Sequence, residues 1–224
     1  NVYQDTVYFN GEPILTDPHL ATEGFIVKFD AEGNQLWGTY ISGNKDVNVS
    51  TFYERNGYLY VTGGTNSQIG ISTANTYQTQ YQTQTSTTCF LMKFDATTGQ
   101  KIWGTYLGDV GCYSNVTVDS NDNIYLKNET NTGFVKLNSQ GQFVSEIILE
   151  DGFYIASSPL IDDADNLYIQ VRDVGSESHG TVGTYKPVKT ADAEMLLIKY
   201  NNAFVKQWAT YYNNIGIPAG VNAP

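Results

Sequence analysis

Apolar and polar residues alternate in short segments that recur four times along the chain. The clearest copy runs from Phe25 to Asp30, turns at Gly33 and continues through Trp37 to Tyr40. In the first three copies an Asp or Asn leads into a glycine, which predicts a β-hairpin with a type I turn and a left-handed residue. We therefore expect hairpins at Gly24 to Tyr40, Cys89 to Tyr106, Gly133 to Ile148 and Met195 to Tyr211.

Two further alternating segments follow each of the first three hairpins. The first covers Val47 to Glu54, Val116 to Asp119 and Ile155 to Ile161. The second is a closing strand at Gly57 to Thr62, Asn123 to Leu126 and Asn166 to Val171. Four strands per repeat are typical of a propeller blade. The sequence thus predicts an all-β fold, a single β-propeller domain over residues 1–224 with about four repeats.

Both ends of the chain resemble the interior of a blade. Asn1-Val2-Tyr3 matches the closing-strand motif Asn123-Ile124-Tyr125, and residues 220–223 align with residues 46–49. We expect the chain to start and end mid-blade. Either its first strand completes its last blade, or the chain is part of a larger propeller.

The spacing of the repeats separates a constant blade from variable loops. The recurring lysines Lys28, Lys93, Lys136 and Lys199 are 65, 43 and 63 positions apart. The extra residues lie in Asn66 to Thr88 and Asp173 to Glu194, where we expect insertions to leave strand pairing unchanged and to carry the function. Aromatic residues within them are the candidate partner-binding residues, namely Tyr77, Tyr81 and Tyr185.

Tryptophan recurs at one repeat position, as Trp37, Trp103 and Trp208. A repeated aromatic residue in the middle of a strand indicates packing between blades, and a ring of sugar-binding tryptophans is the alternative. The recurring lysines are expected to lie across a strand from a carboxylate or to extend to the rim.

Composition narrows the class of partner. The 224 residues are 41% hydrophobic and 16% charged, with a net charge of −11. The 12 basic residues are scattered singly, so nucleic acid is not an expected partner. No apolar stretch is long enough for a transmembrane helix, and the amino-terminal residues lack a signal-peptide pattern.

Candidate chemistry is sparse. The segment Asp119 to Asn123 resembles the opening of a calcium loop, but Thr130 stands where the bidentate glutamate belongs, so we predict an Asx-rich hairpin turn with weak calcium binding as the alternative. His19 and His179 have no cysteine or serine motif beside them. The sequence therefore assigns no catalytic, cofactor or metal residue and predicts a protein that is not an enzyme. Cys89 and Cys112 form either a disulfide or two thiols.

The repeat resembles the "beta-propeller repeat" proteins common in envelope and secreted proteins of bacteria, notably the Bacteroidetes. Lys93 to Gly108 and Asp119 to Tyr125 carry the resemblance, together with Asn75 to Thr79. Asp95 to Trp103 is also similar to the repeat of quinoprotein dehydrogenase propellers, although no matched set of metal and cofactor residues accompanies it. The first resemblance implies a propeller fold and no common catalytic residues.

Repeat, composition and resemblance together predict a non-catalytic protein-binding scaffold. The resemblance places it in the bacterial periplasm, on the outer membrane or outside the cell, in a secretion, adhesion or motility assembly. A carbohydrate-binding module is the first alternative, and a propeller enzyme, either a glycosidase or quinoprotein-like, is the second.

Overall fold

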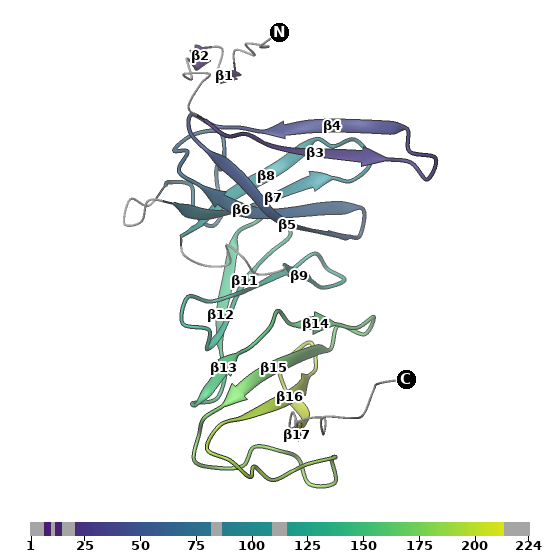
Figure 1. Ribbon diagram of the computed structural model, residues 1–224, viewed down its shortest axis with the longest axis vertical. Helices are drawn as coiled ribbons and strands as arrows, with labels where there is room; N and C mark the ends of the chain where they lie inside the picture. Colours follow the sequence, from purple (N-terminus) through teal and green to yellow (C-terminus); the bar gives the residue numbers. More distant parts are fainter. Residues whose placement is uncertain (1–6, 10–11, 15–20, 82–86, 109–115, 213–224) are drawn as a thin grey trace, which may run out of the picture. The chain divides into compact units, whose positions relative to one another are not determined.

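The computed structural model describes residues 7–9, 12–14, 21–81, 87–108 and 116–212 of the chain. Within these ranges all regular structure is β-strand, arranged in antiparallel sheets (Figure 1). The described residues contain no helix that could cross a membrane. The predicted all-β fold, with sheets of the kind that form propeller blades, is therefore confirmed. Residues 1–3 and 220–223, the expected blade fragments at the two ends, lie outside the described ranges.

The strands fall into five sheets within the described ranges. Two sheets are single hairpins, β1 (Val7–Phe9) with β2 (Glu12–Ile14), and β3 (Gly24–Phe29) with β4 (Gln35–Ile41). A four-stranded sheet contains β5 (Val47–Arg55), β6 (Tyr58–Thr65), β7 (Thr88–Asp95) and β8 (Lys101–Gly108). Another contains β9 (Thr117–Val118), β10 (Ile124–Lys127), β11 (Gly133–Leu137) and β12 (Phe143–Ile148). The last contains β13 (Phe153–Ile155), β14 (Leu160–Ile161), β15 (Leu167–Asp173), β16 (Glu194–Tyr200) and β17 (Lys206–Tyr212).

Two compact units make up the chain, and each is described by itself. The first combines Asn1–Glu129 with Val135–Ser145, and the second combines Thr130–Phe134 with Glu146–Pro224. The single propeller domain over residues 1–224 stays a prediction.

The four predicted hairpins are confirmed as β3–β4, β7–β8, β11–β12 and β16–β17. Each larger sheet, however, combines such a hairpin with the strands that precede it, two in the four-stranded sheets and three in the last sheet. A sheet therefore begins at the third strand of one repeat. In the first of them β6 pairs with β7 from Tyr58 opposite Asp95 to Thr65 opposite Thr88. The first insertion is therefore the loop that connects β6 to β7. Two antiparallel strands that follow each other in the chain need only such a loop at one end of the pair.

Side-chain oxygens of Asp and Asn close the hairpin turns. In the β11–β12 turn, Asn138 Oδ1 accepts hydrogen bonds from the backbone N–H groups of Gln140 and Gln142, and Gly141 has a φ of 73°. The same pair of bonds occurs at Asp30, Asp119, Asp162 and Asn201. The predicted Asx turn at Asp119 to Asn123 is therefore confirmed, since its carboxylate is saturated by local donors.

Both long insertions shield the outer edge of their own sheet. In the first, the Thr73 N–H donates to the Gly104 carbonyl at 2.8 Å, and the Gly104 N–H donates to Thr73 Oγ1 at 3.1 Å. Further along, the Tyr106 N–H donates to the Gln78 carbonyl at 2.9 Å. These bonds supply partners for backbone N–H and C=O groups of β8 that would otherwise be unpaired at the edge of the sheet.

The second insertion repeats this arrangement along β17. Thr181 exchanges the same two bonds with Ala209, and the Tyr211 N–H donates to the Lys186 carbonyl at 2.9 Å. We call residues 73–78 and 181–186 the edge loops. The insertions leave strand pairing unchanged, as predicted, since β6 pairs with β7 and β15 with β16 across them. The edge loops add hydrogen bonds along each outer strand.

We expect Thr73→Val to lower the free energy of unfolding by about 1 to 2 kcal/mol, because the buried Gly104 N–H loses its acceptor. Urea denaturation followed by circular dichroism measures the loss. Thr97→Val, in the exposed β7–β8 turn, is the matched control and should change stability little. Equal losses in the two variants would contradict a structural role for the edge loop.

Candidate functional site

Strand β3 has an open edge. It pairs with β4 on one side, and within the described residues no strand pairs with its other side. The corresponding strands of the other three hairpins, β7, β11 and β16, each have a neighbour on both sides. The open edge of β3 is therefore a position where the repeat would place a further strand.

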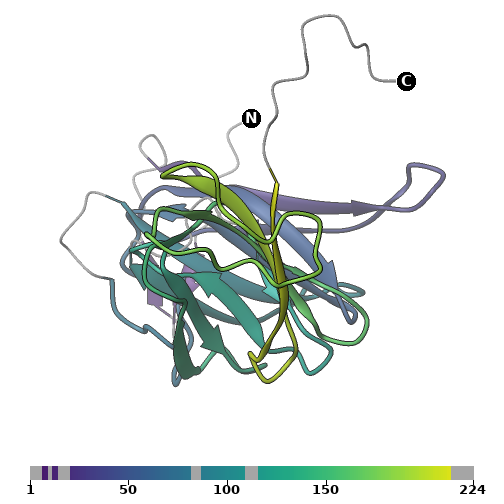
Figure 2. The same ribbon diagram turned by 90° about the horizontal axis from the view of Figure 1, so that it is seen from below.

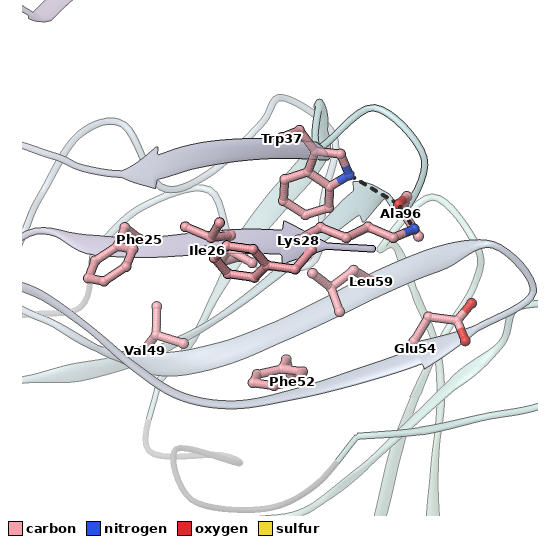
Figure 3. A pocket seen from close by; sticks show the side chains of 11 residues that line it. Phe25, Ile26, Lys28, Trp37, Val49, Phe52, Glu54, Leu59 and Ala96 are labelled. Atoms are coloured by element: carbon pink, nitrogen blue, oxygen red, sulfur yellow. Dashed lines mark hydrogen bonds between the residues drawn. The ribbon is translucent and has the colours of Figure 1, made fainter. Parts of the chain in front are cut away.

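An apolar groove lies between this edge and β5 (Figure 3). The groove is narrow at one end, where the Val47 N–H donates to the Thr22 carbonyl at 2.7 Å and Gly24 lies against Val49. A methyl group at Gly24 would approach Val49 Cγ2 to 2.7 Å, so only glycine permits this contact. The cavity has a volume of about 420 Å³.

Exposed aromatic side chains line the groove. Phe25 on β3 is 67% exposed, and Phe52 on β5 is 72% exposed. The remaining apolar lining comes from both strands and their neighbours, namely Ile26, Val27, Phe29, Trp37, Val49 and Leu59. Clustered exposed aromatics of this kind typically mark an interaction surface.

Contacts with the next hairpin fix the polar end of the groove. Lys28 Nζ donates to the Ala96 carbonyl at 2.8 Å, and Trp37 Nε1 donates to the same oxygen at 3.3 Å (Figure 3). Glu54 lies at the same end on β5. The groove can thus hold an apolar segment in extended conformation, with one cation and one anion beside it.

Two of the three recurring tryptophans, Trp37 and Trp103, pack as predicted. Trp103 is 4% exposed, its Nε1 donates to the Ser139 carbonyl at 3.0 Å, and its ring covers Gly141 in the turn of the next hairpin. Trp37 makes the equivalent contact with Gly99. This burial supports packing over a ring of sugar-binding tryptophans.

The recurring lysines differ from the prediction. Lys93 is buried, and the residues opposite it on the two neighbouring strands are the aromatic Tyr60 and Trp103. Its Nζ lies 3.7 Å from the centre of the Tyr58 ring and 3.0 Å from Asp122 Oδ2 in the β9–β10 turn. The expected carboxylate is present, but it comes from a turn, and cation–π contacts supply the rest. Lys136 and Lys199 also lie over tyrosine rings.

The three predicted tyrosines do not share one surface. Tyr77 is half-buried and stacks on Phe143, while Tyr81 is half-buried and meets the Tyr106 ring edge-on. Only Tyr185 is exposed, at 81%. The expectation of exposed aromatics is therefore wrong for Tyr77 and Tyr81, because the first insertion packs Tyr77 on β12 of the next sheet and Tyr81 on β8 of its own sheet. A partner-binding role for the three residues stays a prediction.

A buried charged cluster that the sequence does not predict lies in the second unit. The Asp173 carboxylate is fully buried and accepts hydrogen bonds from Tyr211 Oη at 2.5 Å and His179 Nδ1 at 2.9 Å. Lys189 Nζ lies 3.6 Å from its other oxygen. Burial alone would raise the pKa of Asp173, but the Tyr211 and His179 hydrogen bonds outweigh it and lower the pKa. Only the length of the polar insertion could have suggested such a contact.

The charged side chains of this cluster pair with one another. His179 Nε2 is 3.8 Å from Glu150 Oε2, the imidazole edge packs on Phe153, and Glu150 also pairs with Lys206 at 2.8 Å. The cluster anchors the second insertion to β15 and β17. Its geometry is that of a structural network, since each charged side chain already has a protein partner.

Taken together, the described sheets define a propeller-type all-β protein with an open strand edge beside an apolar groove. No protein-family model and no curated protein sequence matches the chain. Among solved structures it is similar to the quinohemoprotein alcohol dehydrogenase ADHIIG from Pseudomonas putida HK5, with 11% identity and a TM-score of 0.44. The match covers 86% of this chain and 43% of that protein, so the chain spans less than half of its length.

Proposed function

We propose that this protein is a non-catalytic protein-binding scaffold of the bacterial periplasm, outer membrane or cell exterior. In this proposal the groove between β3 and β5 receives an extended segment of a partner polypeptide, which pairs with the open edge of β3. The observation that carries the proposal is the coincidence of an unpaired strand edge with exposed aromatic side chains. Strand addition of this kind takes affinity from main-chain bonds and specificity from side-chain pockets.

The other sheets indicate how such a strand would bind. β6 pairs with β7, and β15 pairs with β16, along the edge that β3 leaves open. In these pairs Tyr60 lies opposite Lys93 and Tyr168 lies opposite Lys199. We therefore expect the bound segment to alternate apolar and polar residues and to place an aromatic ring opposite Lys28.

The state of Cys89 supports the proposed location in the periplasm or outside the cell. Cys89 is fully buried and disulfide-bonded. Disulfides persist in oxidising compartments, which for a bacterium means the periplasm or the exterior. Cys112, the other cysteine of the chain, lies outside the described residues.

A labelled peptide with the closing-strand sequence of residues 122–128, Asp-Asn-Ile-Tyr-Leu-Lys-Asn, is the probe for the groove. We expect fluorescence anisotropy to show saturable binding to the chain. Phe52→Ser should weaken binding at least about tenfold, because it removes an aromatic wall of the groove. Replacement of the peptide tyrosine by alanine should weaken it similarly.

Leu160→Ser is the matched control, because Leu160 is also 72% exposed but lies on β14. It should leave peptide binding unchanged. The rival occupant is the segment 1–6 of the chain itself, whose Asn1-Val2-Tyr3 matches the closing-strand motif. Binding only after deletion of residues 1–6 would assign the groove to that segment and contradict the proposal, as would absence of binding to both forms.

A further inference from the structure

Consecutive hairpins of the first unit are joined by a contact that occurs twice. The indole N–H of a tryptophan donates to a carbonyl in the next turn, from Trp37 to Ala96 and from Trp103 to Ser139. The ring then covers the turn glycine. A methyl group at Gly99 would lie 2.6 Å from Trp37 Cε3, and one at Gly141 would lie 2.9 Å from Trp103 Cε3. The contact therefore requires glycine in the receiving turn.

An edge-loop tyrosine completes the second of these contacts. The Tyr77 N–H donates to the Gly141 carbonyl at 2.7 Å, and the Tyr77 ring stacks on Phe143 with 5.8 Å between ring centres. We call this contact between consecutive hairpins the joint. One side of the joint consists of a tryptophan and an edge-loop tyrosine. The other side is an Asx turn with glycine.

The second unit presents the first side of this joint without a receiving turn among the described residues. Trp208 lies on β17 opposite Lys199, as Trp103 lies on β8 opposite Lys93. Tyr185 follows Thr181 in its edge loop as Tyr77 follows Thr73. Whereas Tyr77 is half-buried, Tyr185 is 81% exposed.

The first hairpin presents the other side of the joint. Its turn, residues 30–34, has Gly33 at a φ of 86°, and a methyl group added there would meet no atom within 4 Å. In two perpendicular views the turn projects beyond the neighbouring strands β5 to β8 (Figures 1 and 2). The turn of the last hairpin has Phe204 in place of glycine, so it lacks the flat surface that an indole needs.

We propose that Trp208 and Tyr185 form a docking surface for the residue 30–34 turn of a second copy of this chain. The Trp208 indole donates to the Ala31 carbonyl, the position equivalent to Ala96 and Ser139. The Tyr185 N–H donates to the Gly33 carbonyl, as Tyr77 does to Gly141. The two surfaces differ, so the contact is head-to-tail and builds a closed ring or a linear array of copies. This surface is separate from the groove, and neither proposal depends on the other.

Sedimentation velocity over a wide concentration range tests the contact. We expect concentration-dependent association of the chain. Gly33→Asn should abolish it, because asparagine tolerates a positive φ but its side chain would collide with the indole. Gly57→Asn is the matched control, since Gly57 also has a positive φ (79°) and open space around it, and it should associate normally.

Trp208→Ala should weaken the association about 30-fold or more, as removal of a central interface aromatic does. Tyr185→Ala is the second variant, because loss of so exposed a side chain leaves folding intact. A chain that remains monomeric at every concentration overturns the proposal. So does association that Gly33→Asn leaves unchanged or that Gly57→Asn abolishes equally.

Discussion

Trp103→Ala is expected to lower the free energy of unfolding by about 3 to 5 kcal/mol. The indole is almost fully buried, packs in a cluster with Tyr60, Leu91 and Leu137, and holds the turn of the next hairpin through its hydrogen bond to Ser139. Its removal leaves a large cavity and an unpaired carbonyl. Equilibrium urea denaturation followed by far-ultraviolet circular dichroism measures the change.

Glycine substitutions separate this contact from general packing. Gly141→Ala should be more destabilising than Gly33→Ala, because both residues have a positive φ but only the Gly141 methyl meets an indole. In the Trp103→Ala background that collision disappears, so the two changes should not be additive. Additive losses, or equal losses at Gly33 and Gly141, would refute the role assigned to the Trp103–Gly141 contact.

Asp173→Asn is expected to cost about 3 to 5 kcal/mol, the range for removing one member of a buried ion pair. The variant leaves Lys189, which is 7% exposed, without its counter-charge and replaces an acceptor of the Tyr211 and His179 hydrogen bonds by an amide. Asp163→Asn, on an exposed turn, is the control and should be nearly neutral. Comparable losses in the two variants would contradict the anchoring role of the cluster.

The contribution of Asp173 should also depend on pH. Its folded-state pKa lies below the ordinary value of 3.8, so the stabilisation is fully present well above that value and is lost as the pH falls through the folded pKa. The stability difference between the wild-type chain and Asp173→Asn should therefore narrow between pH 5 and pH 2. A constant difference across this range would show that the ionised form is not the stabilising one.

Hairpins and turns follow from the sequence because their determinants are local. Alternation of apolar residues fixes each strand, and an Asx side chain with a left-handed residue fixes each turn, as at Asn138 and Gly141. The recurrence of Trp37 and Trp103 also indicates their packing role, since an aromatic residue at the same strand position in two repeats is expected to have the same surroundings in both.

The site could be anticipated only in part. The repeat spacing indicates the insertions, where Tyr185 is exposed, as the functional regions, but nothing in the sequence indicates the groove between β3 and β5. The groove depends on the absence of a neighbour along β3 within the described residues, and its lining, Phe25 and Phe52, reads in the sequence as ordinary strand residues. The residues of a strand do not indicate which distant strand pairs with it, or whether one does.

The sequence by itself determined the all-β class, the four hairpins and their turn chemistry, because these depend on residues within one hairpin. The tertiary structure decided which strands share a sheet, that the edge loops cover β8 and β17, and that Asp173 meets His179, Tyr211 and Lys189. These contacts join residues far apart in the chain. Their formation depends on the closing of long loops and on burial, which no local pattern of residues encodes.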